Sequence, residues 1–465
     1  MVLGDNMESD TITAIATAVS PAGIGIVRIS GEEAFEIAER IFKNKDGKGF
    51  DLINFESHTV HYGFIFDGDN MIDEVLLTIF RAPRSYTAED TIEINCHGGP
   101  YILKRVLDTV IKYGARLADP GEFTRRAFMN GRIDLTEAES VMELISSKNE
   151  FSRNNSLKTL RGSVYRKISE IRDKILHEAA FIEAALDDPE HYSLEDYSDK
   201  LISTAEDLRK DIDRLIYRSG SGRLMSEGIS TVIVGKPNVG KSSLLNMLLQ
   251  EERAIVTEIA GTTRDTVEAP LRIGNIILNI VDTAGIHDTT DIVESIGVDK
   301  ARKIANDADL ILYVIDSSIP LDDDDDSIIE LIHGRKTIVI LNKSDLKAEV
   351  REEDISEMLE CPVVSVSTLN EDGVDELEKT ITDMFFNDSF DDKNEVYITN
   401  NRQIEALKRA SKSLGFVIQS IKNSMSEDLY SSDLMDAYSF LGEIIGEDTD
   451  DDLADRIFSD FCMGK

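Results

Sequence analysis

The stretch Gly235-Lys-Pro-Asn-Val-Gly240-Lys241-Ser242 decides the fold of the middle of this chain. It follows the β-branched run Thr231–Val234 and precedes Ser243–Leu249, whose apolar spacing predicts a helix. A G-x-x-x-x-G-K-S loop needs this context, because its glycines let backbone N–H groups close around a phosphate at a helix N-terminus. Lys241 would then place a cation on the β and γ oxygens, and Ser242 would offer its hydroxyl to Mg²⁺. The stretch therefore predicts a phosphate-binding loop, the P-loop, between a strand and a helix.

Strand-like runs alternate with helical segments around this loop, which predicts a doubly wound parallel sheet with crossover helices. The acidic run Asp322–Asp326 falls in the same region, and we expect it to form a solvated loop. A metal site is the less favoured alternative, because five neighbouring carboxylates cannot all point at one ion. The expected strands are Thr231–Val234, Ile276–Val281, Leu310–Ile315, Thr337–Leu341 and Val363–Val366.

Three further motifs supply the other parts of a GTP site. Asp282-Thr283-Ala284-Gly285 ends an expected strand, where an aspartate can hold the Mg²⁺ shell and the Gly285 N–H can sense a γ-phosphate. Asn342-Lys343-Ser344-Asp345 ends another strand, and its last carboxylate can accept from the ring N–H and the exocyclic amine of guanine, a pair that adenine does not present. In Gly261-Thr262-Thr263-Arg264-Asp265, Thr263 can meet Mg²⁺ and the γ-phosphate. Together the motifs select GTP over ATP.

The composition limits the classes of protein to which the chain can belong. Its 465 residues suggest three domains at roughly 150 residues each, and 41% hydrophobic residues exclude a disordered or fibrous protein. A net charge of −39 argues against a broad nucleic-acid footprint, which needs a basic face. Cys96, Cys361 and Cys462 lack disulfide-framework or zinc-ligand spacing, which indicates a reducing compartment. Because residues 1–29 resemble neither a signal peptide nor a membrane span, we expect a soluble cytoplasmic protein.

The periodicity of the chain changes three times, so four segments are expected. An α+β region comes first, a helical region second, the α/β region third and more helices last, after an acidic linker near Asp388–Asp392. An α/β domain inserted into a helical domain explains this order, because two short helical pieces can complete one bundle. The predicted boundaries are 1–121, 122–225, 226–388 and 389–465.

Motifs across essentially the whole chain resemble one known family. The G motifs are similar to those of translation-factor-related small GTPases, with Ser367-Thr368-Leu369 at the last base-contacting element, where Thr368 replaces the usual Ala. The flanking motifs resemble those of the MnmE (TrmE) family of tRNA modification GTPases. They are Asp10–Thr17, Gly25–Gly31, Tyr86–Asp90, His97–Pro100, Asp119–Phe128, Asp452–Phe458 and Phe461–Lys465.

The resemblance implies a homodimer held by folate-binding N-terminal domains, with G domains that meet when GTP and K⁺ are bound. It further implies a complex with an FAD-dependent partner of the MnmG (GidA) type. Together they would install an aminomethyl or carboxymethylaminomethyl group at carbon 5 of the wobble uridine of certain tRNAs. The one-carbon unit would come from 5-formyl- or 5,10-methylene-tetrahydrofolate. Because the chain is so acidic, we expect the partner to carry most of the basic surface that holds tRNA.

The resemblance also assigns ions and a catalytic acid. Ser242 and Thr263 would take Mg²⁺, while Asn238 would take K⁺ with Thr257, Ile259 and Thr262, supplying the charge that an arginine finger supplies elsewhere. Ile286 stands where a Ras-like protein has a water-orienting Gln, and it cannot hydrogen-bond a water; carboxylates follow at Asp288, Asp291 and Glu294. Glu294 matches the family's catalytic glutamate, the alternative being an exposed acid at a helix start. The implied nucleotide contacts are Asn238, Val239, Gly240, Lys241, Ser242, Ser243, Thr257, Glu258, Ile259, Ala260, Gly261, Thr262, Thr263, Asp282, Thr283, Ala284, Gly285, Asn342, Lys343, Ser344, Asp345, Ser367 and Thr368.

The implied folate contacts are Arg28, Glu89, Arg132 and Lys465. Taken without the family, Arg28 and Glu89 could instead be a structural ion pair. Cys462 lies close to Lys465, whose ammonium would lower a thiol pKa, so it is either a nucleophile or a buried thiol on the last helix.

Two other functions compete with the tRNA-modifying enzyme. One is a GTP-controlled switch, such as a ribosome-assembly GTPase, in which hydrolysis only times binding. The other is a folate carrier with a vestigial GTPase, against which the intact Lys241, Asp282 and Asp345 argue.

Overall fold

The computed structural model describes residues 10–188, 191, 197–251, 269–274, 276–281, 308–386, 396–447, 456–459, 461 and 464. The chain forms two compact units. The first comprises Met1–Met142, Thr159–Ala180 and Tyr438–Lys465, and the second comprises Glu143–Lys158 and Phe181–Ala437. Within the described ranges, no helix combines the length and the apolar character needed to cross a bilayer. The four domain boundaries expected from the sequence stay predictions.

A seven-stranded sheet, in the order β3-β4-β5-β6-β2-β1-β7, forms the first unit's core. Its neighbours pair antiparallel except β1 and β7, which are parallel. All seven strands are in the described part of the chain. They are β1 (Ile12–Ile15), β2 (Gly25–Ser30), β3 (Phe42–Lys43), β4 (Thr59–Asp67), β5 (Asn70–Phe80), β6 (Thr91–Cys96) and β7 (Arg116–Leu117).

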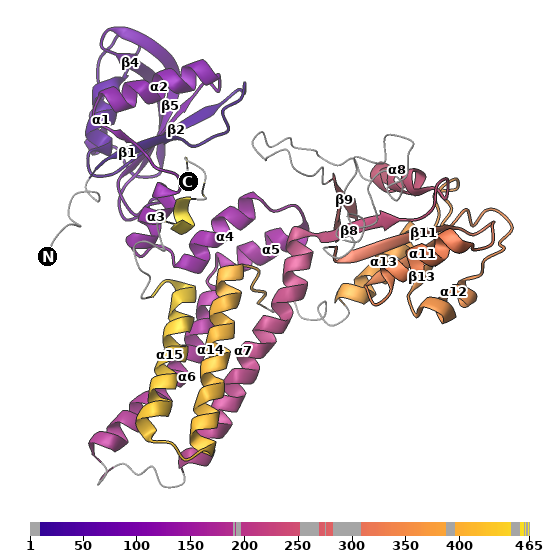
Figure 1. Ribbon diagram of the computed structural model, residues 1–465. Helices are drawn as coiled ribbons and strands as arrows, with labels where there is room; N and C mark the ends of the chain where they lie inside the picture. The colour runs from indigo at the N-terminus through magenta and orange to yellow at the C-terminus, as the bar shows by residue number, and fades with distance from the viewer. Residues whose placement is uncertain are drawn as a thin grey trace. The chain divides into compact units, whose positions relative to one another are not determined.

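Helices α1 (Ala34–Ile41) and α2 (Pro100–Lys112) cover one face of this sheet (Figure 1). Their apolar residues, Ile37 and Val106 among them, join the alternate strand residues in one buried cluster. On the other face, Ile12 packs with Phe123 of α3 (Glu122–Met129). The unit also contains the short 3₁₀ helix η1 (Leu52–Asn54) and α4 (Leu135–Ile145).

The second unit contains a six-stranded sheet in the order β13-β12-β11-β8-β10-β9. All neighbours pair parallel except the edge strand β9, which is antiparallel to β10. The sequence did not predict β9, because its run is short and contains Pro270, which interrupts a strand pattern. The strands are β8 (Ile229–Val234), β9 (Ala269–Ile273), β10 (Ile276–Ile280), β11 (Leu310–Asp316), β12 (Thr337–Asn342) and β13 (Val363–Ser365).

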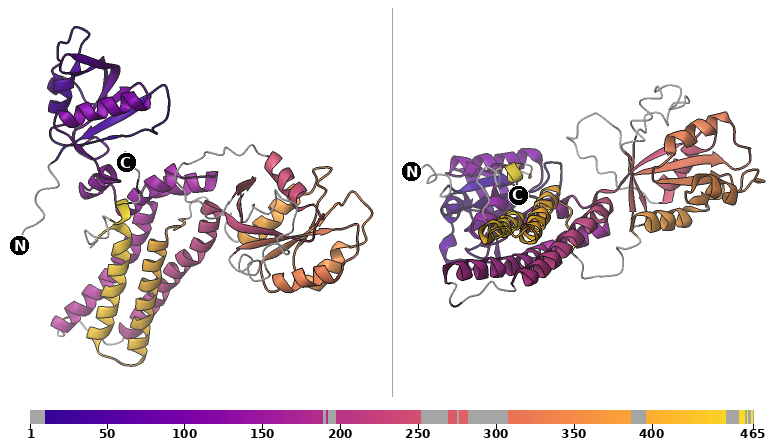
Figure 2. Two further views of the ribbon diagram at one scale, coloured as in Figure 1. Left: turned by 45° about the horizontal axis from the view of Figure 1, so that its top comes forward. Right: turned by 60° about the horizontal axis from the view of Figure 1, so that its bottom comes forward.

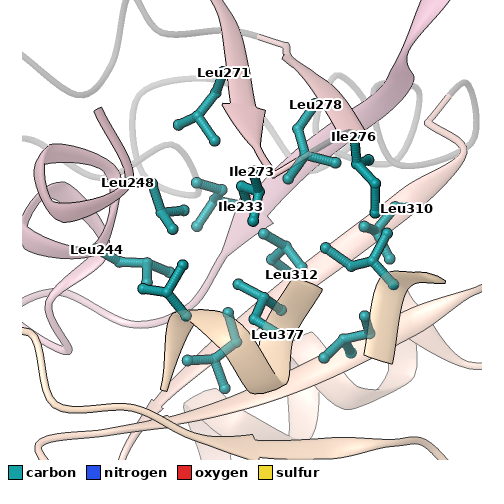
Figure 3. Packing of buried hydrophobic residues seen from close by; sticks show 14 of the residues in the cluster. Ile233, Leu244, Leu248, Leu271, Ile273, Ile276, Leu278, Leu310, Leu312 and Leu377 are labelled. Carbon is teal, nitrogen blue, oxygen red and sulfur yellow. The ribbon is translucent and has the colours of Figure 1, made fainter. Parts of the chain in front are cut away.

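Helices cover both faces of this sheet, so the run Leu310–Ile315 of its central strand β11 is apolar throughout. Along β11, Leu312 and Val314 enter the cluster under α8 (Lys241–Glu251) and α13 (Val374–Phe386), which Figure 3 shows. Tyr313 points the other way, into the cluster under α11 (Asp323–Ile332) and α12 (Glu352–Leu359). Because side chains alternate between faces, a continuous apolar run needs two covering layers. The predicted doubly wound sheet is confirmed.

The acidic run is not the solvated loop expected from the sequence. Asp322 is the N-cap of α11, its side chain accepts a hydrogen bond from the Asp324 N–H, and Asp325 completes a capping box. Carboxylates at a helix start are stabilised by unpaired N–H groups and by the helix dipole. The charge density that suggested a loop therefore stabilises the first turn of a helix.

Long helices precede and follow the six-stranded sheet. Two of them, α7 (Tyr197–Glu227) and α14 (Asn401–Lys422), run antiparallel and side by side, as Figures 1 and 2 show. Ser411 donates a 2.6 Å hydrogen bond to Asp213 across this pair. The chain thus enters the sheet from one helix of the pair and continues into the other after leaving it. The remaining helices are α5 (Glu150–Thr159), α6 (Ser163–Asp187) and α15 (Glu427–Ile445).

Candidate functional site

The P-loop follows β8 and has little space around its backbone. Gly235 has a φ of +151°, and a Cβ there would lie 2.4 Å from the carbonyl oxygen of Val314 in β11. Asn238 adopts the left-handed conformation with a φ of +63°, which asparagine tolerates better than most residues. The loop is therefore held in one shape by the neighbouring strand, as a phosphate cradle requires.

Lys241 and Ser242, the expected phosphate and Mg²⁺ contacts of the loop, lie in the first turn of α8. Lys241 begins α8, and its Nζ donates hydrogen bonds of 2.6 Å to the Gly235 carbonyl and 2.7 Å to the Lys236 carbonyl. Ser242 and Ser243 are exposed in the first turn of α8. A single hydroxyl fits Mg²⁺, which binds few protein oxygens and completes its shell with water and phosphate. Backbone N–H groups at this helix end favour an anion.

Asn342, at the end of β12, joins the P-loop to the expected base-binding segments. Its fully buried Nδ2 donates a 2.8 Å hydrogen bond to the Val239 carbonyl. Its Oδ1 accepts from the Thr368 N–H at 3.4 Å. Gly240 makes this possible, because a Cβ there would lie 2.0 Å from the Asn342 Nδ2. Three motifs that are far apart in the sequence therefore meet at one side chain.

Asp345, the expected guanine-binding residue, is held by a hydrogen bond from a neighbouring motif. Ser367 donates a 2.6 Å hydrogen bond to Asp345 Oδ1, while Lys343 Nζ lies 2.5 Å from Asp316 Oδ2. Burial of Asp316 opposes its charge, but hydrogen bonds from Lys343 and Ser318 outweigh burial and hold the pKa of Asp316 below its ordinary value. Asp316 therefore stays ionised and fixes Lys343. Sequence reasoning missed Asp316, although its position at the end of β11, beside the P-loop strand, is a usable signal.

Several expected GTP-site residues lie outside the described part of the chain. The predictions for them therefore stay predictions. They are Thr257, Glu258, Ile259, Ala260, Gly261, Thr262, Thr263, Asp282, Thr283, Ala284, Gly285 and Glu294.

A second constellation lies in the first unit, around the ring of Tyr86. The guanidinium carbon of Arg28 lies 5.3 Å from the ring centroid and that of Arg132 lies 5.1 Å from it. Arg28 also pairs with Glu93, with Nε 2.9 Å from Oε1, and its Nη1 donates to the Gly464 carbonyl at 3.3 Å. The structure thus brings Arg28 and Arg132 together with the penultimate residue of the chain.

Glu89 lies near these arginines but has partners of its own. It accepts hydrogen bonds from Ser30 at 2.8 Å and from Arg126 Nη1 at 3.1 Å. Arg28 and Glu89 therefore do not pair with each other, but each makes an ion pair, Arg28 with Glu93 and Glu89 with Arg126. The register explains this, since Arg28 stands directly opposite Glu93 across β2 and β6.

A cavity of about 460 Å³ opens beside Glu89. Its lining is polar and includes Glu122, Arg125, Arg126 and Asn130. Its other lining residues are mainly acids, Glu32, Asp90 and Asp119 among them, so the cavity suits hydrogen-bond donors such as the N–H groups of a polar ring. The Tyr86 ring and its two guanidinium groups do not line this cavity, and they suit a carboxylate or an aromatic group. Sequence reasoning did not assign roles to Tyr86 or Arg126, although Tyr86 is in a motif quoted for the resemblance.

The remaining residues to place are the two at the end of the chain and the histidine of the His97–Pro100 motif. Cys462 and Lys465 lie outside the described residues, so their proposed roles stay predictions. His97 is exposed and its Nδ1 lies 2.7 Å from Asp73 Oδ1, a contact that raises the pKa of His97. This pair lies at the end of β6 and provides a structural role for the histidine.

Comparison with known proteins gives matches along nearly the whole chain. The family model described as GTP-binding protein TrmE N-terminus matches residues 11–132, and the MnmE helical domain model matches residues 135–462. The tRNA modification GTPase MnmE of Lachnoclostridium phytofermentans is 54% identical, covering 99% of this chain and 100% of that protein. Its namesake in Clostridioides difficile is 46% identical, covering 98% and 99%. The solved G domain of the T. maritima FeoB iron transporter is 26% identical, covering 33% of this chain and 97% of that one, with a TM-score of 0.25.

Proposed function

The chain belongs to the MnmE family of tRNA modification GTPases, whose members hydrolyse GTP, and on that premise we propose its reaction and partners. It is a K⁺-activated GTP hydrolase in the cytoplasm. With an FAD-dependent partner of the MnmG type, it adds an aminomethyl or carboxymethylaminomethyl group at carbon 5 of the wobble uridine of certain tRNAs. The single observation that carries the proposal is 54% identity over essentially the full length of a tRNA modification GTPase.

The geometry of the P-loop supports the assignment of its residues to GTP. The backbone of Gly235 to Gly240 cradles the phosphates, Lys241 neutralises the β and γ oxygens, and Asp345 selects guanine. Mg²⁺ at Ser242 would neutralise charge that develops on the phosphates. K⁺ at Asn238, whose φ is +63°, would add a second positive charge beside the phosphates. The first shells of these ions would be completed by Thr263 for Mg²⁺, and by Thr257, Ile259 and Thr262 for K⁺.

We assign water orientation to Glu294, because Ile286 cannot hydrogen-bond the attacking water. A carboxylate can hold that water directly or through a second water. Glu294 would then hold the attacking water near the γ-phosphate.

The Tyr86 constellation is the proposed folate site, and it uses Arg28, Glu89, Arg132 and Lys465. Ser30 and Arg126 hold the Glu89 carboxylate in place, which suits it to accept N–H groups from a pterin ring. The guanidinium groups are suited to the glutamate tail of the same cofactor. The cofactor, 5-formyl- or 5,10-methylene-tetrahydrofolate, would supply the one-carbon unit.

The first unit also carries a surface suited to the proposed homodimer. On the outer face of its sheet, Tyr62 of β4 stands opposite Leu76 of β5, and both are exposed together with Val60. An exposed apolar row on the sheet face opposite α1 and α2 is a common protein–protein contact. We assign the dimer contact to this face.

The net charge supports a division of labour in tRNA binding. At −39 the chain repels a polyanion at long range, so the flavoprotein partner supplies most of the basic surface. A tight, strongly salt-dependent complex between tRNA and the isolated chain would contradict this division.

Nucleoside mass spectrometry of total tRNA tests the proposal. Cells lacking the gene should lose the aminomethyl modifications of wobble uridine, and the wild-type gene should restore them. The Glu294→Ala gene should fail to restore them, whereas Glu353→Ala, an exposed acid on α12, should succeed. Cys462→Ser separates the nucleophile from the buried thiol, and Cys361→Ser, a free cysteine in the G domain, is its matched control.

An unchanged tRNA profile in cells without a redundant pathway would favour the second candidate, a GTP-controlled switch or ribosome-assembly GTPase. The potassium assignment has its own measurement. GTP hydrolysis should be faster in K⁺ than in Na⁺ at equal ionic strength, and equal rates would remove Asn238 from the ion site.

A further inference from the structure

A second lysine of the P-loop, Lys236, is bound to the acidic start of α11. Its Nζ lies 2.6 Å from Asp325 Oδ2 and 2.8 Å from Asp322 Oδ2. The side chains of Lys236 and Asp325 are only 10% and 2% exposed. A charge pair this well shielded from water is screened less and geometrically better defined than a surface ion pair.

Asp325 is itself held from two other directions. Its Oδ1 accepts a 2.8 Å hydrogen bond from the hydroxyl of Tyr313, which is fully buried in β11. Its Oδ2 accepts the Asp322 N–H at 3.0 Å, the reciprocal half of the capping box. Both carboxylate oxygens are therefore fixed by a strand and a helix, and Asp325 is a rigid anchor for Lys236.

The backbone of Lys236 connects this anchor to the phosphate-binding ammonium. The Lys236 carbonyl accepts a 2.7 Å hydrogen bond from Lys241 Nζ, and the neighbouring Gly235 carbonyl accepts another. A shift of Lys236 would therefore move the acceptors that orient Lys241. It would also release the backbone leading into Asn238, which is held in the left-handed conformation.

The charges show that Lys236 is not itself a phosphate ligand. Two carboxylates already bind its one ammonium, and hydrogen bonds to both raise the pKa of Lys236 against the opposing effect of burial. A phosphate would have to displace a buried ion pair to reach it, which leaves Asp325 uncompensated. The second half of the P-loop is also held in place, by the hydrogen bond from Asn342 to the Val239 carbonyl.

We infer that Asp325 is a positioning residue for GTP: through Lys236 it fixes the first half of the P-loop and so the place of Lys241. This inference rests on the proposed assignment of the P-loop as the GTP site. It gives the acidic run at the start of α11 a role in nucleotide binding that neither its charge nor its position in the sequence suggests.

The test is a double-mutant cycle on the full-length chain with a fluorescent N-methylanthraniloyl GDP as the probe. Lys236→Met and Asp325→Asn should each weaken binding roughly ten-fold, because a loosened loop residue must be ordered again on binding. The double variant should bind the probe no more weakly than either single variant, since each single substitution already breaks the same ion pair. Lys236→Arg keeps the ion pair and should bind within about two-fold of wild type. Asp324→Asn removes an equal charge from an exposed position in the same helical turn and should leave binding unchanged.

Thermal unfolding without nucleotide separates positioning from stability. If Asp325→Asn is unfolded, the test is the comparison of nucleotide binding by Lys236→Met and by Lys236→Arg, because both variants keep the buried aspartate. Unchanged or tighter binding by folded Lys236→Met would overturn the inference, and so would additive losses in the double variant. A wild-type chain that binds no guanine nucleotide would instead overturn the proposed function.

Discussion

Replacing Ser367 by Ala should weaken GTP binding by releasing the carboxylate that recognises guanine. Ser367 is buried, and its hydroxyl donates a 2.6 Å hydrogen bond to Asp345 Oδ1 while accepting the Asn370 N–H at 3.2 Å. The alanine variant removes the donor but leaves the backbone bridge between Ser367 and Asp372. The loop should therefore keep its path while Asp345 gains freedom to rotate.

The expected loss follows from the exposure of the two partners. A hydrogen bond to a charged acceptor contributes about 1.5–3 kcal/mol. Asp345 is exposed, so water replaces part of this contact in the variant, and about 1–2 kcal/mol remains. At about 1.4 kcal/mol per factor of ten, the Kd for GTP should rise roughly 5- to 30-fold.

The assay compares GTP with ITP, whose base lacks the exocyclic amine. In wild type the carboxylate accepts from two guanine N–H groups but from one of hypoxanthine, so a misplaced Asp345 should weaken GTP binding more than ITP binding. Ser365→Ala, the same deletion two residues earlier on β13, is the control. Equal weakening of both nucleotides, or a change in Kd below two-fold for GTP, would refute the reasoning.

Three further predictions concern the two units. Tyr86→Leu should abolish binding of 5-formyl-tetrahydrofolate in calorimetry. Tyr86→Phe, which keeps the ring and loses the hydroxyl that contacts Thr124 at 2.8 Å, should still bind; binding by Tyr86→Leu would exclude the ring from the site. Burial raises the pKa of Glu122, but hydrogen bonds from Arg116 and its other donors outweigh burial and lower it below 4.5. Glu122 thus stabilises the fold above the unfolded pKa and loses this effect as pH falls through the folded pKa. The Glu122→Gln variant should therefore unfold more easily at pH 7, and its free energy of unfolding should fall less steeply in acid than that of wild type. Parallel acid curves for the two proteins would count against the Arg116–Glu122 ion pair. Leu377→Ala, in the cluster of Figure 3, should lower the free energy of unfolding in urea by about 2–5 kcal/mol, and a loss under 1 kcal/mol would contradict that packing.

Local patterns were sufficient to predict the α/β sheet. The run Leu310–Ile315 is apolar at every position, which is typical of a strand covered on both faces, and β11 occupies that place. The P-loop was predictable for a related reason: its residues are consecutive, so their spacing alone defines the site. Asn342 and Thr368 were also in recognisable motifs. Their hydrogen bond to each other could not be predicted, because it depends on the order of the strands in the sheet.

Contacts that depend on packing between distant segments could not be predicted. Arg28 and Glu93 are 65 residues apart, and only the register of β2 with β6 places them opposite each other. The link from Lys236 to Asp325 depends on where α11 begins relative to the P-loop. The charge pattern alone predicted that the acidic run is exposed to solvent, because such a pattern does not show that a neighbouring loop provides a cation.

The paired cations reconcile a net charge of −39 with two sites for anionic ligands. Lys343 lies against Asp316, Lys236 against Asp325, and Arg28 against Glu93. Each carboxylate fixes its cation in place and cancels its charge beyond a Debye length, about 8 Å at physiological salt. Such sites recognise an anion through short, directed contacts and generate no attractive field around the protein. The same pairing that prepares this chain for GTP therefore provides no long-range attraction for tRNA, and this is the task that we propose for a more basic partner.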